Sequence, residues 1–172
     1  MSLENIKKLR ELTSLGVNDC RKALEETRGD FDKALEVLRS KGLSVIEGKK
    51  DRKTLQGLVD AYIHFGGNLG AIVEINCETD FVARTDVFKK FVKDVAIQVA
   101  ATNPKYISRR DIAPEEISKI ENIDDYVREH CLLEQLFVKD NTLTIEGYLR
   151  QVISQTGENI IIKRFSRFSL EG

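Results

Sequence analysis

The residues best suited to nucleophilic chemistry are Cys77 and His64, a thiol and an imidazole that in an enzyme would serve as nucleophile and general base. Cys77 follows Val73 and Ile75 at every second position, so the alternation predicts a small buried residue on the inner face of a strand. The sequence offers neither a third residue to orient the base nor an oxyanion-hole loop. We therefore predict that Cys77 belongs to the core, and a thiol enzyme remains an alternative class.

Metal, phosphate and nucleic-acid chemistry are weakly indicated. His64 and His130 are the only histidines and lack the spacing of metal ligands, so no metal and no cofactor is expected. The stretch GGNLG at 66–70 lacks a phosphate-loop pattern and is typical of a hairpin turn. Basic and aromatic residues alternate in 163–168, which would suit stacked RNA. We favour a basic outer face on an edge strand, so no direct nucleic-acid partner is expected.

The composition is that of a globular protein without an extreme charge. The chain has 172 residues, of which 41% are hydrophobic and 32% charged, with a net charge of -1. Long-range attraction to nucleic acid or an anionic membrane is therefore not favoured. No run approaches the ~18 apolar residues of a membrane helix, and the first residues lack a signal core. Three widely spaced cysteines fit a reducing cytoplasm.

The N-terminal part is predicted to be a helical module covering residues 1–42. Apolar residues recur there at helical spacing, as in Phe31, Ala34, Leu35 and Leu38. Three short helices with one apolar face each can bury those faces only against one another. We therefore expect a small bundle near the lower size limit of independent stability.

Local signals place the ends of these helices. Asn18 is expected to cap the second helix, Asp30 the third, and Gly42 to close the third. The charged segment 43–56 is predicted to be a linker or a solvated helix extension. Its basic run 49–53 could also bind phosphate, which is the less favoured interpretation.

The remainder, 57–172, is predicted to be an α+β core domain in which helices cover a small antiparallel sheet. Two alternating runs around the glycine-rich turn indicate a hairpin, and a β-branched, aromatic stretch indicates a last strand. The expected strands are 58–65, 71–79 and 158–172, and the expected helices are 86–101, stopped by Asn103-Pro104, 111–135, broken near 113–114, and 144–157.

The stretch INCETDFVAR at 75–84 breaks the strand pattern. Alternation stops at Glu78, and Thr79, Asp80 and Phe81 follow. Thr79 or Asp80 could cap a helical turn over a buried Phe81. Alternatively, Phe81 is exposed and contacts another protein. The residues alone leave both possibilities open.

Four blocks, in order along the whole chain, carry a resemblance to a known family. They are LRELTSLGVNDCRKALEE, VEINCETDFVAR, EQLFVKD and GENIIIKRF. Together they resemble translation elongation factor Ts in its compact, single-core form. The resemblance implies a ubiquitin-associated-like helical module, a linker and a core domain. It also implies a cytoplasmic, non-enzymatic guanine-nucleotide exchange factor that binds elongation factor Tu in its GDP-bound and nucleotide-free forms.

The resemblance also implies which residues act. In the family, a short segment after the second strand approaches the nucleotide site of the partner and disturbs its magnesium ion. The matching residues in this sequence are Thr79, Asp80, Phe81 and Val82. Those matching the contact face of the helical module are Arg10, Gly16, Val17, Asp19 and Cys20.

The chain departs from the family pattern at three places. Ser14 to Asn18 replace a small-residue turn that two methionines usually follow, and Leu136 stands where proline is common. The segment 114–132 is shorter than in compact relatives of the family. In those relatives a helical hairpin can project from this segment. The shortening affects any contact that the hairpin makes, including contacts that pair subunits in a homodimer. The alternative function is a helical interaction module fused to an unrelated α+β domain, with no effect on GDP release.

Overall fold

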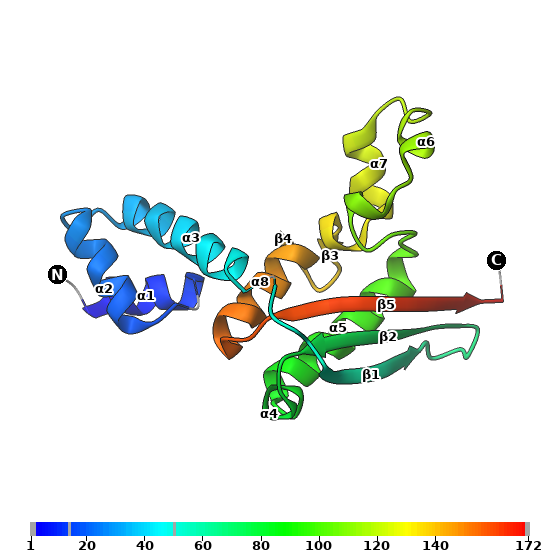
Figure 1. Ribbon diagram of the computed structural model, residues 1–172, viewed down its shortest axis with the longest axis horizontal. Coiled ribbons are helices and arrows are strands. Elements are labelled where there is room, and N and C mark those ends of the chain that lie inside the picture. The colour runs from blue at the N-terminus through cyan, green and yellow to red at the C-terminus, as the bar shows by residue number, and fades with distance from the viewer. Residues whose placement is uncertain (1–2, 14, 50, 171–172) are drawn as a thin grey trace. The chain divides into compact units, whose positions relative to one another are not determined.

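The computed structural model describes residues 3–13, 15–49 and 51–170 and confirms the predicted α+β class (Figure 1). The chain forms two compact units. One comprises Met1–Lys53 with Arg150–Asn159, and the other comprises Thr54–Leu149 with Ile160–Gly172. The domain limits expected from the sequence stay a prediction.

The N-terminal residues form three helices, as predicted: α1 (Leu3–Thr13), α2 (Val17–Glu26) and α3 (Phe31–Glu47). One apolar face of each helix packs against the other two, because a short amphipathic helix gains most of its stability from tertiary packing. The buried cluster consists of Ile6, Leu9, Cys20, Ala23, Leu24, Ala34 and Leu38.

The helix ends differ in part from the expected ones. Asp30 accepts a hydrogen bond from the backbone N–H of Lys33 at 3.1 Å, so the predicted cap of α3 is confirmed. Asn18 is wrong as the cap of α2, since the cap is Gly16 and Asn18 lies in the first turn. Gly42 does not close α3 but lies inside it. A single interior glycine costs only about 1 kcal/mol relative to alanine, which the rest of a seventeen-residue helix can offset.

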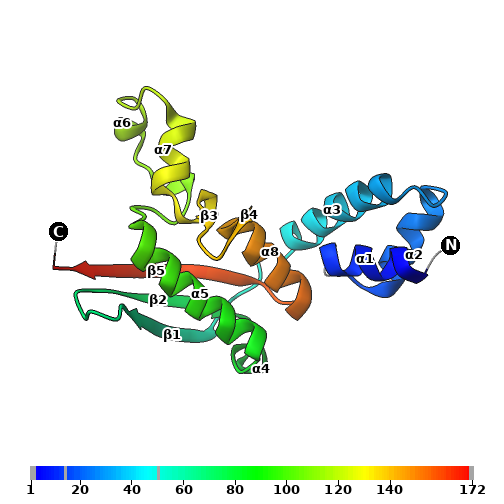
Figure 2. The ribbon, with the colours of Figure 1, turned by 180° about the vertical axis from the view of Figure 1, so that it is seen from behind.

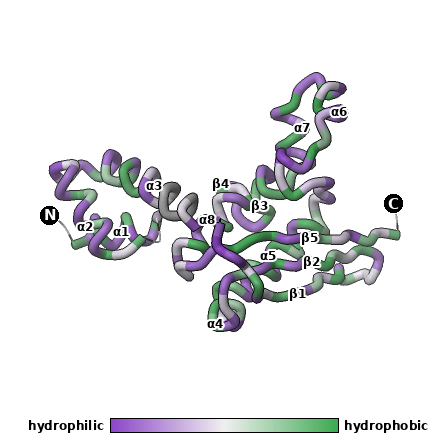
Figure 3. Tube along the Cα trace, in the orientation of Figure 1, coloured by the Kyte–Doolittle hydropathy of each residue, from purple (hydrophilic) through white to green (hydrophobic). Residues whose placement is uncertain are grey.

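The second unit is built on a three-stranded antiparallel sheet in the order β1-β2-β5. The predicted hairpin joins β1 (Gln56–Ile63) and β2 (Leu69–Cys77), and the predicted last strand is β5 (Ile160–Ser169). Figure 3 shows that β5 starts with a hydrophobic stretch and becomes hydrophilic further along. This change follows the sequence, in which three isoleucines precede Lys163 and Arg164.

Helix α5 (Asp86–Thr102) lies across one face of this sheet, as Figures 1 and 2 show from opposite sides. The helix stops where the sequence predicts, at Asn103, which has a left-handed φ of 48°. The buried side chains of α5 pack against the inner face of the sheet, and together they form the core of the unit. The helix contributes Phe88, Phe91, Val92, Val95, Ala96 and Val99, and β2 contributes Ala71, Val73, Ile75 and Cys77.

The segment expected as one helix with a single break is more fragmented than predicted. It contains η1 (Arg109–Asp111), α6 (Pro114–Ile117), α7 (Ile123–His130) and η2 (Leu132–Glu134). Asn122 caps α7 by accepting from the N–H of Asp125, which starts a new helix rather than continuing the previous one. A small cluster around Ile112, Val127 and Cys131 holds these pieces together.

A short hairpin precedes the last helix and was not predicted. It consists of β3 (Leu136–Phe137) and β4 (Asp140–Thr144), followed by α8 (Ile145–Thr156). Within the described ranges, none of the helices has the length and apolar character of a membrane span.

Candidate partner-binding site

The stretch after β2 forms a one-turn helix, α4 (Asp80–Ala83), that is fixed at both ends by threonines. Thr79 caps it, because its Oγ1 accepts a hydrogen bond from the N–H of Val82 at 3.4 Å. Thr85 caps the following helix α5, accepting from the N–H of Phe88 at 3.2 Å. The Thr85 hydroxyl also donates to the carbonyl of Val82 at 2.8 Å. The turn is therefore joined rigidly to both β2 and α5.

Phe81 points out of this turn into solvent. Its side chain is 81% exposed, whereas the neighbouring Val82 and Ala83 are buried. The interpretation that placed Phe81 in the core does not hold in this structure. A single exposed apolar side chain is common on protein surfaces, so the exposure makes the ring available to another molecule but does not by itself identify a contact. Val82 lies on the inner side, where it supports the turn from below.

Asp80 is partly exposed and already has a cationic neighbour. Its carboxylate lies 2.9 Å from the guanidinium of Arg84, one helical turn further on. Both side chains are substantially exposed, so the pair contributes at most about 1 kcal/mol and can open easily. In the free protein, the negative charge of Asp80 is therefore largely compensated by a weakly held cation.

The geometry separates the thiol from the imidazole. Cys77 is fully buried and its Sγ lies 3.1 Å from the carbonyl oxygen of Thr79. His64 lies at the other end of the hairpin, next to Ile63, and its Nδ1 is 3.0 Å from the hydroxyl of Tyr62. Seven strand residues separate the two ends, which is about 23 Å. The described part of the chain also contains no group of three His, Cys, Asp or Glu placed to hold a metal ion.

The predicted contact residues of the helical module fall into exposed and buried sets. Arg10, Gly16 and Val17 are exposed, and the side chain of Val17 is 50% accessible at the start of α2. Asp19 is partly exposed and forms an ion pair of 2.6 Å with Lys41, which raises the pKa of that lysine.

The remaining residue of this set, Cys20, is fully buried. Its side chain belongs to the apolar cluster of the module, and this burial raises the pKa of its thiol. The turn residue Ser14, and Lys50 in the basic run, lie outside the described residues.

One feature of the site was missed by reasoning from the sequence. It is Arg84, whose spacing of four residues from Asp80 on a helix is the signal that would have indicated the pair. In the EQLFVKD block, which the resemblance predicts to contact the partner, Leu136 and Val138 are exposed on either side of the buried Phe137.

Comparison with known proteins agrees with the resemblance in the sequence. The family model described as Elongation factor TS matches residues 2–125. The elongation factor Ts of Thermoanaerobacter sp. (strain X514) is 45% identical, covering 98% of this chain and 94% of the relative. That of Carboxydothermus hydrogenoformans is 44% identical over 96% of this chain and 87% of the relative. That of Thermotoga maritima is 41% identical over 99% and 96%.

The chain therefore belongs to the elongation factor Ts family, as predicted, and is a translation elongation factor with a nucleotide-exchange role. The alignment with the Thermoanaerobacter relative spans 191 positions, whereas the chain has 172 residues. The relative thus carries residues that this chain lacks. The placement of that shortening in 114–132 stays a prediction.

Proposed function

We propose that this protein binds elongation factor Tu in its GDP form, disturbs the magnesium and nucleotide site of that partner, and promotes GDP release during translation elongation. The family membership supports the choice of partner. The observation that carries the mechanism is the exposed ring of Phe81 on a turn held by threonine caps at both ends. Thr79 and Val82 act by holding this turn, while Phe81 and Asp80 reach the partner.

Exchange follows from thermodynamic linkage and needs no covalent step. If the factor binds the nucleotide-free partner more tightly than the GDP-bound partner, then GDP must bind the complex more weakly by the same ratio. GTP reloading expels the factor for the same reason. This proposal assigns no catalytic residue and no cofactor to the chain, and it places the protein in the cytoplasm with the translation machinery.

Phe81 and Asp80 have different roles in this proposal. Phe81 acts as a rigid apolar wedge, and because the turn is fixed before binding, little conformational entropy is lost on docking. Asp80 brings a carboxylate close to the magnesium environment of the partner. The ion pair between Asp80 and Arg84 is weak, so it can open when the partner binds, or Arg84 can move together with Asp80. The negative charge of Asp80 then disturbs the water molecules and ligands that surround the magnesium ion of the partner.

A second contact comes from the helical module. Arg10, Gly16 and Val17 form the exposed part of its predicted face, with Asp19 at the edge, and Cys20 holds α2 in the module core. Two contacts on one chain raise the effective concentration of each for the partner. The module therefore anchors the factor while α4 acts on the nucleotide site.

We also propose that two copies of the chain pair in the complex with elongation factor Tu. The sheet face opposite α5 leaves four apolar side chains exposed, namely Val59, Ile63, Ile72 and Phe168. Three of these also line a hollow of about 570 Å³ at the hairpin end of the sheet. A face of this kind can pair with itself about a twofold axis. Sedimentation equilibrium should show a dimer that Ile72→Lys converts to a monomer, whereas a monomeric wild-type chain, alone and with its partner, contradicts the pairing.

The experiment that tests the exchange function is the release of fluorescent GDP from purified elongation factor Tu after addition of excess unlabelled GDP. The wild-type chain should accelerate release in a dose-dependent and saturable manner. Release at the spontaneous rate, at all concentrations of a folded chain, contradicts the proposal and favours the alternative of an unrelated interaction module.

A further inference from the structure

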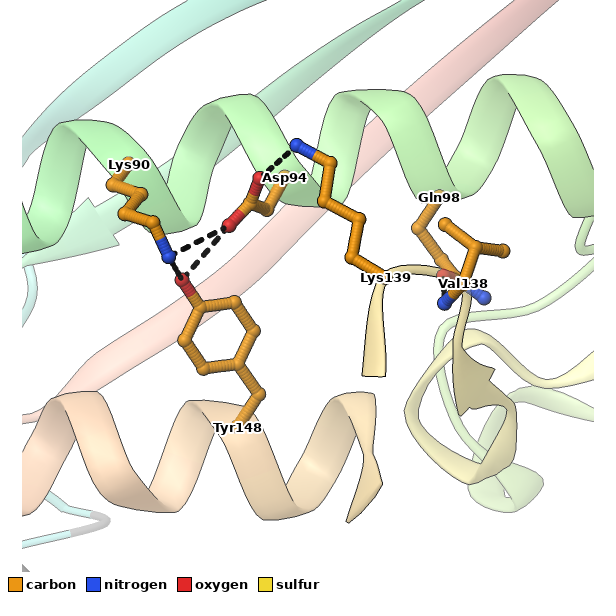
Figure 4. A network of polar contacts seen from close by, with 6 residues as sticks. All are labelled: Lys90, Asp94, Gln98, Val138, Lys139 and Tyr148. Carbon is orange, nitrogen blue, oxygen red and sulfur yellow. Dashed lines mark hydrogen bonds and ion pairs between the residues drawn. The ribbon is translucent and has the colours of Figure 1, made fainter. Parts of the chain in front are cut away.

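Four polar or charged side chains are buried among the described residues, namely Asp94, Gln98, Gln135 and Asn159. The first three form hydrogen bonds inside the second unit, as Figure 4 shows for Asp94 and Gln98. Asn159 differs, because its Nδ2 donates at 3.0 Å to the carbonyl of Arg52, a residue 107 positions earlier in the chain. Burying a carboxamide costs free energy unless its polar atoms find partners. The buried amide of Asn159 thus holds the backbone of the charged segment 43–56.

A second asparagine holds the same segment two residues further on. Asn76, near the end of β2, donates from its Nδ2 to the carbonyl of Thr54 at 3.3 Å. Gly57 lies opposite Asn76 and has a φ of 153°, and a Cβ there would be only 2.2 Å from the carbonyl oxygen of Ile75. Glycine alone accepts this φ together with so close a contact. The chain therefore enters β1 close against β2, within reach of the Asn76 side chain.

Both asparagines lie at the end of the sheet from which α4 follows. Cys77 is the last residue of β2 and pairs with Ile160, the first residue of β5. Asn76 directly precedes the former, and Asn159 directly precedes the latter. The same strand β2 thus carries one anchor of the charged segment and, just beyond its end, the Phe81 turn.

The two anchors shorten the tether of the helical module. Helix α3 ends at Glu47, so the four residues 48–51 separate the module from the first anchored residue. Without the anchors, the tether would extend to the start of β1 and would comprise the eight residues 48–55. Lys53 alone lies between the two anchored residues, and the boundary between the two units directly follows it. Because both anchors bind backbone carbonyls, a charged tether can be held whatever side chains it carries.

Tether length determines how much the module can add to the binding of one partner. The exposed contact residues of the module and the Phe81 turn belong to the same chain. Once one of them binds, the other meets the partner at an effective concentration that falls roughly as the −3/2 power of the tether length. Doubling the tether from four to eight residues therefore lowers this concentration about threefold.

We propose that Asn76 and Asn159 are positioning residues that anchor the tether of the helical module and thereby raise the effective concentration of its contact face for the partner. This inference rests on the proposed exchange function. It goes beyond that function because it assigns part of the affinity to two asparagines that act only through the backbone of the tether.

NMR relaxation of the free protein tests the anchoring itself. A carbonyl shares one rigid peptide plane with the N–H of the next residue, so the N–H groups of Lys53 and Leu55 report on the two anchored carbonyls. Their order parameters should be about 0.85 in the wild-type chain and below about 0.6 when Asn76→Ala and Asn159→Leu are combined. Low values in the wild-type chain, or unchanged values in the double variant, would overturn the proposal. If Asn159→Leu does not fold, Asn76→Ala alone should lower the value at Leu55.

Titration of nucleotide-free elongation factor Tu tests the consequence for affinity. The double variant should raise the dissociation constant about threefold in the wild-type background. It should have no effect in a chain with Val17→Asp, whose module should no longer make its contact. Equal losses in both backgrounds, or wild-type affinity of the folded double variant, would overturn the proposal. Gln151→Leu, which removes an exposed amide, is the matched control and should keep wild-type affinity.

An insertion separates tether length from any loss of stability. Four residues of glycine and serine, inserted between Gly48 and Lys49, lengthen the tether from four residues to eight while both asparagines remain. This variant should also raise the dissociation constant about threefold, at an unchanged melting temperature, and wild-type affinity would overturn the role of tether length. A wild-type chain that does not bind the partner ends the proposed function and this role together, whereas the order parameters still decide the anchoring.

Discussion

At the scale of single residues, Asp80 is the group whose charge can be tested without changing its shape. Asp80→Asn removes the charge and the ion pair with Arg84 but keeps the Thr79 cap. We expect slower stimulated GDP release, with a deficit that shrinks as magnesium is lowered, because less bound metal then remains to be displaced. Release rates over a magnesium series check this, with Asp86→Asn, an exposed carboxylate on α5, as the control. An Asp80→Asn deficit that is independent of magnesium would contradict the electrostatic role.

Cys77 tests the remaining enzyme alternative. A serine hydroxyl at this position can donate to the carbonyl of Thr79, where Sγ already lies at 3.1 Å. The buried hydroxyl therefore has a partner. Cys77→Ser should lower the free energy of unfolding by only about 1 kcal/mol, which is the least that a buried polar group without a partner would cost. Denaturant unfolding and GDP release measure the two effects. Loss of exchange at unchanged stability would point to thiol chemistry.

The site could be predicted in part from its residues. The threonine cap and the end of alternation at Glu78 are local signals, so Thr79 was recognised as a candidate cap. The exposure of Phe81 was not decided by local pattern, because a capped turn can direct a phenylalanine inward or outward. The packing of Val82 and Ala83 against the neighbouring elements decides it.

At the scale of elements, strong periodicity was a reliable guide and short segments were not. The apolar stripe of α5 and the β1–β2 hairpin follow the prediction closely. The β3–β4 hairpin did not show in the sequence, because its first strand has two residues and is held by the side chain of Gln98. Such a contact depends on tertiary structure, which no local pattern reports.

The α6–α7 segment contains a carboxylate on which a pH effect can be predicted. Glu116 accepts hydrogen bonds from Tyr106 at 2.5 Å and from Tyr126 at 2.6 Å, and these bonds lower the pKa of Glu116. A lowered pKa in the folded state means that this contribution to stability is present above the ordinary glutamate pKa and is lost as pH falls through the folded value.

We therefore expect the packing of Tyr126 to loosen on acidification while α5 remains folded. Tyrosine NMR signals during an acid titration measure the effect, and Glu116→Gln should abolish its pH dependence. If the signals of Tyr126 change with pH in the same way in the glutamine variant, Glu116 is not the responsible group.

In the whole molecule, the helical module should add affinity for the partner independently of α4. Removing residues 1–53 is an unsuitable test, because the buried Asn159 donates to the carbonyl of Arg52 at 3.0 Å. Val17→Ala, at an exposed position, should instead leave the melting temperature unchanged and raise the dissociation constant for the partner severalfold. The maximal rate of GDP release at saturation should be unaltered. Val37→Ala, at another exposed position of the module, is the control, and equal effects of both changes would contradict a specific contact face.

In the proposed mechanism, Phe81 is a wedge that acts on another protein. The most direct measurement is the rate of GDP release from elongation factor Tu with Phe81→Ala, taken together with its thermal melt. Because the ring is exposed, folding should change by no more than ~0.5 kcal/mol. Stimulated release should slow about thirtyfold, as expected for ~2 kcal/mol lost at a hot spot. A Phe81→Ala protein that is destabilised by several kcal/mol, and whose folded fraction still stimulates GDP release at the wild-type rate, would show that Phe81 is a core residue and not a wedge.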